Sequence, residues 1–116
     1  MDLQQKNISQ EEITAIVREL SEKLTDKGAR ALEVIDVHEQ TTLADRFIIC
    51  TGTSNTHIRT LTQEVERVME EQFHMRPHHI EGYDNAQWVL CDYVFLVVHI
   101  FRADVREFYS LERLWK

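Results

Sequence analysis

The sequence predicts a single α/β domain whose elements follow the order α, β, β, α, β, β, α. Three stretches carry apolar residues at helical spacing, and they alternate with two pairs of short apolar runs that are rich in β-branched residues. The 116 residues include only three glycines and one proline, which leaves no room for a linker between domains. We therefore expect one domain over residues 1–116, with disorder confined to residues 1–8.

The first helix is predicted to begin near Ser9, because Ser9 and Glu12 have the spacing of a capping box. Lys27 and Gly28 supply the cation and the glycine that commonly end a helix. The residues between them form one apolar face, made of Ile13, Ile16, Val17, Leu20 and Leu24.

Two strands are predicted next, over residues 31–37 and 46–51, where the runs ALEVIDV and RFIICT are apolar and too short for a stable helix. The connection over residues 38–45 is short and polar, which favours antiparallel neighbours over a helical crossover. The second run shows no alternation of apolar and polar residues. We therefore expect it to be buried on both faces of a sheet.

A strand-to-helix turn follows at residues 51–57, TGTSNTH, where Gly52 permits a tight turn and Thr53, Ser54 or Asn55 can cap the free amides. Pro77 follows the next helix, whose apolar face consists of Ile58, Leu61, Val65, Val68 and Phe73. We expect the charged side chains of this helix to face water, namely Glu64, Glu66, Arg67, Glu70 and Glu71.

The C-terminal third contains many of the apolar residues of the chain. Residues 78–87 are polar around Gly82 and are predicted to form a loop, with one short edge strand at its start. Residues 88–93 and 96–101 are the two main strands. A last helix has Asp104 in its first turn, which suits the helix dipole, and one apolar face made of Val105, Phe108, Leu111 and Trp115.

The charge balance bears on the kind of partner. Thirteen Lys and Arg against twenty Asp and Glu give a formal net charge of −7. A phosphate backbone is repelled by such a charge, so direct nucleic-acid binding is disfavoured. A basic protein partner is compatible with it, because complementary charge speeds association and orients the two proteins.

Cys50 and Cys91 lie in apolar runs without the CxxC spacing of a zinc site, so they are predicted to be buried thiols. The N-terminus lacks the basic and apolar regions of a signal peptide. No apolar run approaches the roughly 20 residues that a membrane span needs. We expect a soluble, cytoplasmic protein that does not associate with membranes.

The Gly52-Thr53-Ser54 turn precedes a helix and could hold a phosphate group on backbone amides, which allows an enzymatic function. The alternative function is therefore a nucleotide-binding or nucleotidyl-transferring enzyme. The turn lacks the lysine and the spacing of a P-loop. Glu64 and Glu66 are too far apart around a helix, about 200°, to share a metal ion. A capped turn without catalysis is the favoured interpretation.

Histidines offer further candidates. His74, His78 and His79 surround Pro77, but no carboxylate or thiolate stands at a convincing spacing, so an exposed histidine-rich helix exit is favoured over a metal site. No cofactor is predicted. His99 shares a strand face with Val97 and Phe101, where it is either a surface contact or a hydrogen-bonded side chain at the margin of the core.

Trp88, Asp92 and Tyr93 also allow two interpretations. On an exposed sheet face, aromatic side chains anchor protein interfaces and an acidic group can meet a basic partner. Aromatic residues on strands more often pack in the core. The residues alone leave both possibilities open.

Four segments of the sequence match a known family in order and spacing. They are IDVHEQTTLADRFIICTGTSNTHI, IEGYDNAQWVLCDY, VVHIF and FYSLERLW. On these segments, which span about residues 32–115, the chain resembles the ribosomal silencing factor family, also called Iojap-like proteins.

The resemblance implies a compact α/β domain with a mixed sheet, related in fold to nucleotidyltransferases but without their catalytic carboxylates. It also implies a protein that is not an enzyme. Such proteins bind a ribosomal protein on the intersubunit face of the large subunit and hinder joining of the small subunit when nutrients are scarce. Self-association as a homodimer stays an open alternative.

The matching WVLxDY and VVHIF segments place the expected ribosomal-protein contact on Trp88, Asp92, Tyr93 and His99. Asp45 and Tyr109 are secondary candidates. One departure concerns Val94 and Phe95, which stand where the family usually carries Gly-Asp. Because valine and phenylalanine resist positive φ angles, we expect a turn that is wider, shifted in register, or altered as an interface edge.

Overall fold

A computed structural model of the chain describes residues 8–116. The disorder predicted for residues 1–8 lies outside these residues except at Ile8, which packs against the core. The elements in chain order are α2 (Gln10–Asp26), β1 (Arg30–Asp36), β2 (Arg46–Gly52), α3 (Asn55–Phe73), β3 (His79–Glu81), β4 (Trp88–Asp92), β5 (Leu96–Arg102), α4 (Ala103–Tyr109) and α5 (Leu111–Trp115). The predicted order is confirmed, with the short edge strand present as β3 and the last helix divided in two.

The five strands form one mixed sheet in the order β1-β2-β5-β4-β3. Strands β2 and β5 pair in parallel at its centre, whereas the other three pairings are antiparallel. The antiparallel pairing of β1 with β2 was predicted from their short connection. Nearly every residue of β2 is buried, as predicted, and the same holds for β5.

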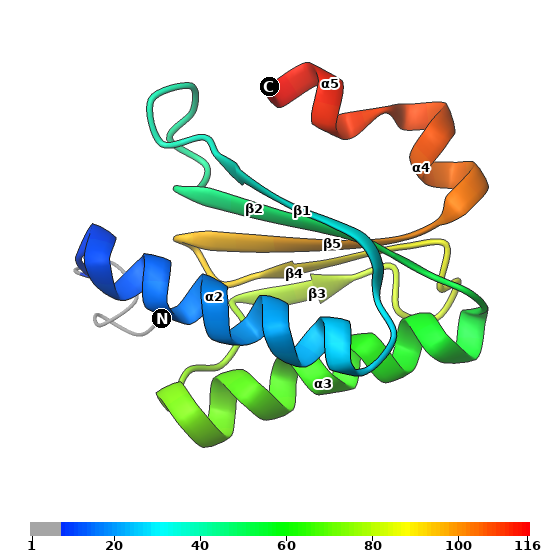
Figure 1. Cartoon of the computed structure of the whole chain (residues 1–116), viewed down its shortest axis with the longest axis horizontal. Coiled ribbons are helices and arrows are strands. Elements are labelled where there is room, and N and C mark those ends of the chain that lie inside the picture. Colours follow the sequence, from blue (N-terminus) through cyan, green and yellow to red (C-terminus); the bar gives the residue numbers. More distant parts are fainter. Residues whose placement is uncertain (1–7) are drawn as a thin grey trace.

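Two helical layers cover the sheet (Figure 1). Helices α2 and α3 lie on one face, and α4 and α5 lie over part of the other. Side chains alternate between the two faces along each strand. On β2, for example, Ile48 and Cys50 join the core under α2 and α3, whereas Phe47 and Ile49 join a second, smaller core on the opposite face.

The start of α2 confirms the predicted capping box. The Glu12 backbone N–H donates to the Ser9 hydroxyl at 3.1 Å, and the Ser9 N–H donates to the Glu12 carboxylate at 3.1 Å. The predicted apolar face of this helix is buried as a whole.

One charged residue of α3 does not face water as predicted. Glu64 is only 6% exposed and accepts two hydrogen bonds from Arg67, at 2.9 and 2.7 Å. The hydrogen bond from Arg67 holds the pKa of Glu64 below its usual value. The prediction was wrong because helical periodicity assigns a side to each residue but does not show how far the neighbouring helix α2 reaches around α3.

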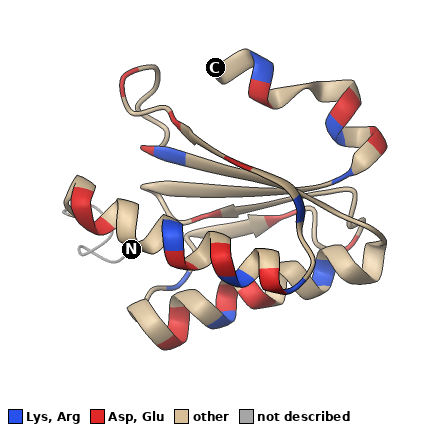
Figure 2. Cartoon of the chain, in the orientation of Figure 1, with Lys and Arg blue, Asp and Glu red and all other residues tan. Residues whose placement is uncertain are grey.

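Charged residues gather on the helical layer that covers the first face (Figure 2). Helix α2 carries five acidic and two basic side chains, and α3 carries four acidic and two basic ones. Much of the negative charge of the protein therefore lies on this side. No helix within residues 8–116 is long and apolar enough to cross a membrane.

The predicted C-terminal helix is broken at Ser110, which has a left-handed backbone with φ 47°. The break turns α5 away from the direction of α4. Leu111 and Trp115 therefore pack on the second core, while Phe108 is 81% exposed. The prediction that Phe108 helps to hold the fold was wrong, because it assumed one continuous helix.

The β4–β5 connection stays tight despite Val94 and Phe95. Val94 adopts φ 77°, and the Phe95 N–H donates to the Tyr93 carbonyl oxygen at 3.0 Å, as in a γ-turn. The Asp92 carboxylate accepts the Val94 N–H at 2.7 Å. The expected widening does not occur. The chain instead accepts a strained conformation that a β-branched residue rarely adopts.

Replacing Val94 by glycine should therefore stabilise the fold. We expect the free energy of unfolding of Val94→Gly to rise by about 1 kcal/mol, because strain relief outweighs the entropy that glycine gains in the unfolded chain. Urea denaturation measures the difference. Val94→Ala is the matched control, since it keeps a Cβ atom and most of the strain. A glycine variant no more stable than the alanine variant would contradict the strain.

Candidate protein-binding surface

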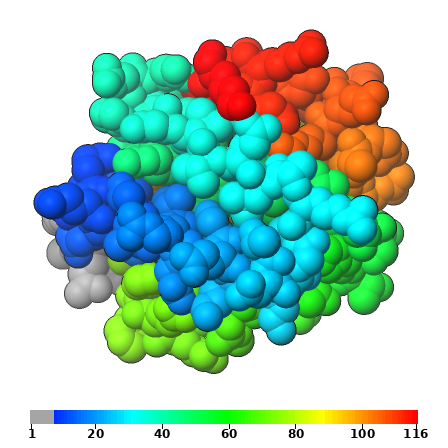
Figure 3. All heavy atoms as spheres, in the orientation of Figure 1, coloured from blue at the N-terminus to red at the C-terminus, as the bar shows by residue number. Residues whose placement is uncertain are grey.

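The second face of the sheet is only partly covered by α4 and α5, and it carries most of the aromatic side chains of the protein. We call this surface the aromatic face and define it by the rings of Phe47, Trp88, His99, Phe101, Phe108, Tyr109 and Trp115. It combines side chains from β2, β4, β5, α4 and α5, which are distant in sequence. In the space-filling view, the orange and red C-terminal helices form one end of the molecule and lie against β1 (Figure 3).

Ring contacts run without interruption through the aromatic face. Trp88 stacks on Phe101 with centroids 4.8 Å apart and contacts Tyr109 at 4.9 Å. Phe101 is fully buried, Trp88 is half-buried and Tyr109 is 54% exposed. The array therefore leads from the core to the surface. Such a gradient is typical of aromatic anchors, which offer contact area without much loss of side-chain entropy.

His99 lies beneath Trp88 and supports its ring. The Trp88 indole Nε1–H donates to His99 Nδ1 at 3.1 Å, so the proton of the neutral imidazole is on Nε2. His99 is 4% exposed and meets the edge of Phe47 at 4.9 Å. Burial lowers the pKa of His99 from 6.5 to about 4. His99 is therefore the hydrogen-bonded side chain at the margin of the core that was one of the two interpretations, and its side chain is too buried to be a surface contact itself. It orients the main aromatic side chain of the surface.

An acidic rim borders the aromatic face on β3 and β4. Ile80 packs against the first core, so His79 and Glu81 lie on the same side as Asp92. His79 Nε2 is 2.8 Å from the Glu81 carboxylate, and its Nδ1 is 3.7 Å from that of Asp92. Two carboxylates thus lie on the same face of the sheet as Trp88 and can meet a basic group of a partner.

The structure brings together four of the six predicted contact residues, namely Trp88, His99, Tyr109 and Asp92. Tyr93 is fully buried in the core under α2 and α3, so its side chain is not on this surface. The reason is the alternation of side chains along a strand, which sends adjacent residues such as Asp92 and Tyr93 to opposite faces.

Asp45 also lies apart from the aromatic rings. Its backbone N–H donates to the Phe95 carbonyl oxygen at 2.8 Å, which ties the β1–β2 loop to the β4–β5 turn. A cavity of about 460 Å³ opens there and is lined by His38, Thr41, Thr42, Ala44, Asp45, Val94 and Phe95. Asp45 belongs to this far end of the sheet, beside the strained turn.

Sequence reasoning missed Phe47, Leu90, Phe101 and Trp115 as parts of the surface. For Leu90 and Phe101 a signal existed, because residues two apart on a strand share a face with Trp88 and His99. For Phe47 and Trp115 the sequence contained no such signal. Their rings meet at 5.4 Å only because β2 pairs with β5 and the chain turns at Ser110.

The Gly52-Thr53-Ser54 turn is occupied by its own hydrogen bonds. The Ser54 hydroxyl accepts the His57 backbone N–H at 3.0 Å, and the Thr53 N–H donates to His57 Nδ1 at 2.9 Å. His57 Nε2 in turn donates to the Lys27 carbonyl oxygen at 2.8 Å. This geometry supports the capped turn over a phosphate site. Among residues 8–116, no group of three or more His, Cys, Asp or Glu side chains could hold a metal ion.

The burial of His99 predicts a pH-dependent stability. In the unfolded chain His99 takes up a proton near pH 6.5, whereas the folded protein keeps it neutral down to about pH 4. Stability should therefore fall as pH drops below 6.5. The expected loss from this residue between pH 7 and pH 5 is about 2 kcal/mol. Urea denaturation of the wild type and His99→Phe at both pH values measures it. An equal loss in both proteins would contradict the prediction.

Comparison with known proteins shows the family of this chain. The model of the family described as "Ribosomal silencing factor during starvation" matches residues 9–116. The ribosomal silencing factor RsfS of Halalkalibacterium halodurans is 37% identical over 90 residues, which cover 78% of this chain and 76% of the relative. A mouse protein named "Mitochondrial assembly of ribosomal large subunit protein 1" is 31% identical over 94 residues, 79% of this chain and 41% of that protein.

A crystal structure of a protein from Chromobacterium violaceum has the same fold. It superposes with a TM-score of 0.85 at 32% identity, and the match covers 90% of this chain and 86% of the other. The family model spans both helical layers and the whole sheet, including every residue of the aromatic face. The chain therefore belongs to the ribosomal silencing factor family.

Proposed function

We propose that this protein binds a ribosomal protein on the intersubunit face of the large ribosomal subunit and sterically blocks joining of the small subunit. In a bacterial cytoplasm this would repress translation when nutrients are scarce. The observation that carries the proposal is the aromatic face, an apolar surface that is only partly covered, on a domain of a ribosomal silencing family. The name of the mouse relative supports the large subunit as the binding site.

The chemistry of the surface favours a protein partner. Tryptophan and tyrosine are enriched at the centres of protein interfaces, where they fill pockets of the partner. Trp88 and Tyr109 are half-buried or exposed and are held in place by ring contacts and by His99. Such fixed side chains lose little entropy on binding, which favours affinity.

The distribution of charge favours a basic protein over RNA. The rim residues Glu81 and Asp92 lie beside the aromatic face, so they can pair with basic side chains at the edge of the contact. The acidic layer of α2 and α3 lies on the opposite side of the sheet. It would face outward from the large subunit, so its negative charge would be kept away from the RNA of that subunit.

Steric exclusion needs no chemical step. The fold measures 35 × 30 × 23 Å along its principal axes. A body of that thickness on the intersubunit face would hold the two ribosomal subunits apart wherever it sits. Catalytic groups are not required for this function, which agrees with a Gly52-Thr53-Ser54 turn that serves as a helix cap.

Replacing Trp88 by alanine should weaken binding to isolated large subunits by about tenfold or more, because a central aromatic anchor is lost. Co-sedimentation with purified large subunits over a range of protein concentrations measures this. Tyr83→Ala is the matched control, since the Tyr83 hydroxyl contacts Gln63 on α3, away from the aromatic face. Circular dichroism should show that both variants are folded. Equal affinities of wild type and Trp88→Ala would show that the interface lies elsewhere on the protein.

The acidic rim should contribute through charge. Asp92→Asn keeps the oxygen that accepts the Val94 N–H but removes the negative charge. We expect affinity for the large subunit to fall about two- to fivefold and to depend less on salt concentration. Glu66→Gln, an exposed change on α3, is the control that alters net charge alone. Should both variants lose affinity equally, the effect would come from net charge and not from the rim.

A subunit-joining assay tests the mechanism. Adding the protein to large subunits before small subunits should reduce the yield of joined ribosomes, and Trp88→Ala should restore it. Binding without any effect on joining would contradict steric exclusion. Sedimentation equilibrium of the free protein tests the alternative of a self-associating module, which predicts a mass that rises with concentration.

A further inference from the structure

The two C-terminal helices are held on the sheet by one buried arginine. Arg106 on α4 is 8% exposed, although an arginine is rarely buried unless its charge is paired. Its guanidinium faces the seam where α4 and α5 meet the ends of β1 and β2. The ring contacts of the aromatic face do not involve Arg106, so they do not explain why this residue is buried.

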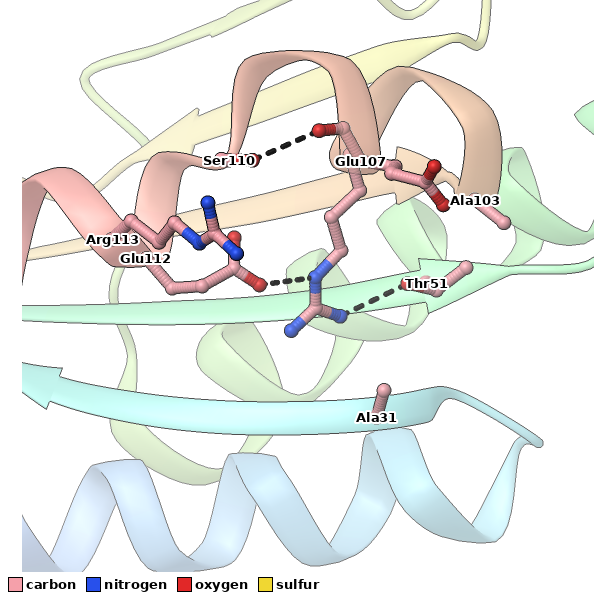
Figure 4. A pocket seen from close by; sticks show the side chains of 8 residues that line it. Ala31, Thr51, Ala103, Glu107, Ser110, Glu112 and Arg113 are labelled. Atoms are coloured by element: carbon pink, nitrogen blue, oxygen red, sulfur yellow. Dashed lines mark hydrogen bonds and ion pairs between the residues drawn. The ribbon is translucent and has the colours of Figure 1, made fainter.

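Each guanidinium nitrogen of Arg106 bonds to a different element. Nε donates to the Glu112 carboxylate of α5 at 2.8 Å, Nη1 to the Thr51 hydroxyl of β2 at 2.9 Å, and Nη2 to the Glu33 carboxylate of β1 at 3.2 Å. The bonds that reach Thr51 and Glu112 are drawn in Figure 4. Lys116, at the end of the chain, forms a second ion pair with Glu33. A planar, forked cation suits this three-way geometry better than a lysine would.

The helices depend on this contact because they are short. Helix α4 has seven residues and α5 has five, and neither has a side-chain hydrogen bond at its N-cap. Helices of that length are not stable without tertiary contacts. Besides the Lys116–Glu33 ion pair, the helices contact the sheet through apolar side chains, chiefly Trp115 on Phe47 and Tyr109 on Trp88.

The seam beside Arg106 is not closely packed. A cavity of about 310 Å³ lies there, lined by Ala31, Thr51, Ala103, Arg106, Glu107, Ser110, Glu112 and Arg113. Removal of the Arg106 charge would leave Glu112 without its ion-pair partner and would leave Glu33 with Lys116 as its one ion-pair partner among residues 8–116. The attachment of α4 and α5 to β1 and β2 would then be weaker.

We propose that Arg106 is a positioning residue that clamps α4 and α5 onto the sheet and thereby keeps the Tyr109 and Trp115 part of the aromatic face assembled. When the clamp is released, the helix pair lifts at the seam and uncovers Phe47 and Ile49. The surface that a partner meets then changes in shape although Trp88 keeps its place on β4. The effect on ribosome binding rests on the proposed function of the aromatic face, whereas the clamp itself does not.

Hydrogen exchange of the free protein tests the clamp without ribosomes. In Arg106→Gln, the amides of residues 103–116 should exchange about tenfold faster or more than in the wild type, while those of β2 and β5 stay protected. Arg113→Gln is the matched control. It removes the same charge from the same cavity, but Arg113 makes no ion pair among residues 8–116, so its exchange should match the wild type.

Glu112→Gln serves as a milder second variant if Arg106→Gln does not fold, because it leaves the bonds of Arg106 to Thr51 and Glu33 in place. It should accelerate exchange of the same segment by a smaller factor. Unchanged exchange in Glu112→Gln and Arg106→Gln, or equal acceleration by Arg113→Gln, would overturn the clamp. So would acceleration spread evenly over the whole sheet.

Affinity for large subunits separates the clamp from the proposed function. Faster exchange together with weaker binding of Arg106→Gln supports both. Faster exchange with unchanged binding keeps the clamp and places the ribosome contact away from Tyr109 and Trp115. The amide exchange of residues 103–116 in Arg106→Lys should be closer to that of Arg106→Gln than to that of the wild type, because one ammonium group cannot reach three elements at once.

Discussion

The parallel pairing of β2 with β5 is the constraint on which the rest of the structure depends. Both strands are buried along nearly their whole length, so the sheet must be covered on both faces. Helices α2 and α3 meet this need fully on one face. On the other face, the two short helices α4 and α5 cover part of the sheet. The open aromatic face follows from this incomplete second layer.

Two polar side chains are retained within that second layer, where apolar residues would cost less to bury. His99 stays neutral and holds the indole of Trp88, while Arg106 stays charged and holds two helices. In each case the polar group fixes the position of aromatic rings, which dispersion forces alone would hold less firmly. Rigid placement, more than added stability, is what these two residues supply to the surface.

Much of the fold could be predicted because local signals agreed with it. The Ser9 capping box, the unbroken apolar run of β2 and the short β1–β2 connection each lead to the observed element. The errors share one cause. Phe108, Glu64 and Tyr93 were assigned to a side by residue type or local match, whereas their sides depend on the break at Ser110, on the packing of α2 against α3 and on strand alternation. Arg106 carried no sequence signal, because two of its three partners lie 55 and 73 residues away.

The position of the negative charge explains how an acidic protein can use an apolar surface. Charges on the aromatic face would have to be desolvated on binding, which costs free energy unless each finds a partner. Placing them on α2 and α3, with the sheet between, avoids this cost while keeping the charge that speeds encounter with a basic protein. The carboxylates of the rim lie near the contact, and there water still reaches them. Increasing salt should therefore slow association more than it hastens dissociation from the aromatic face.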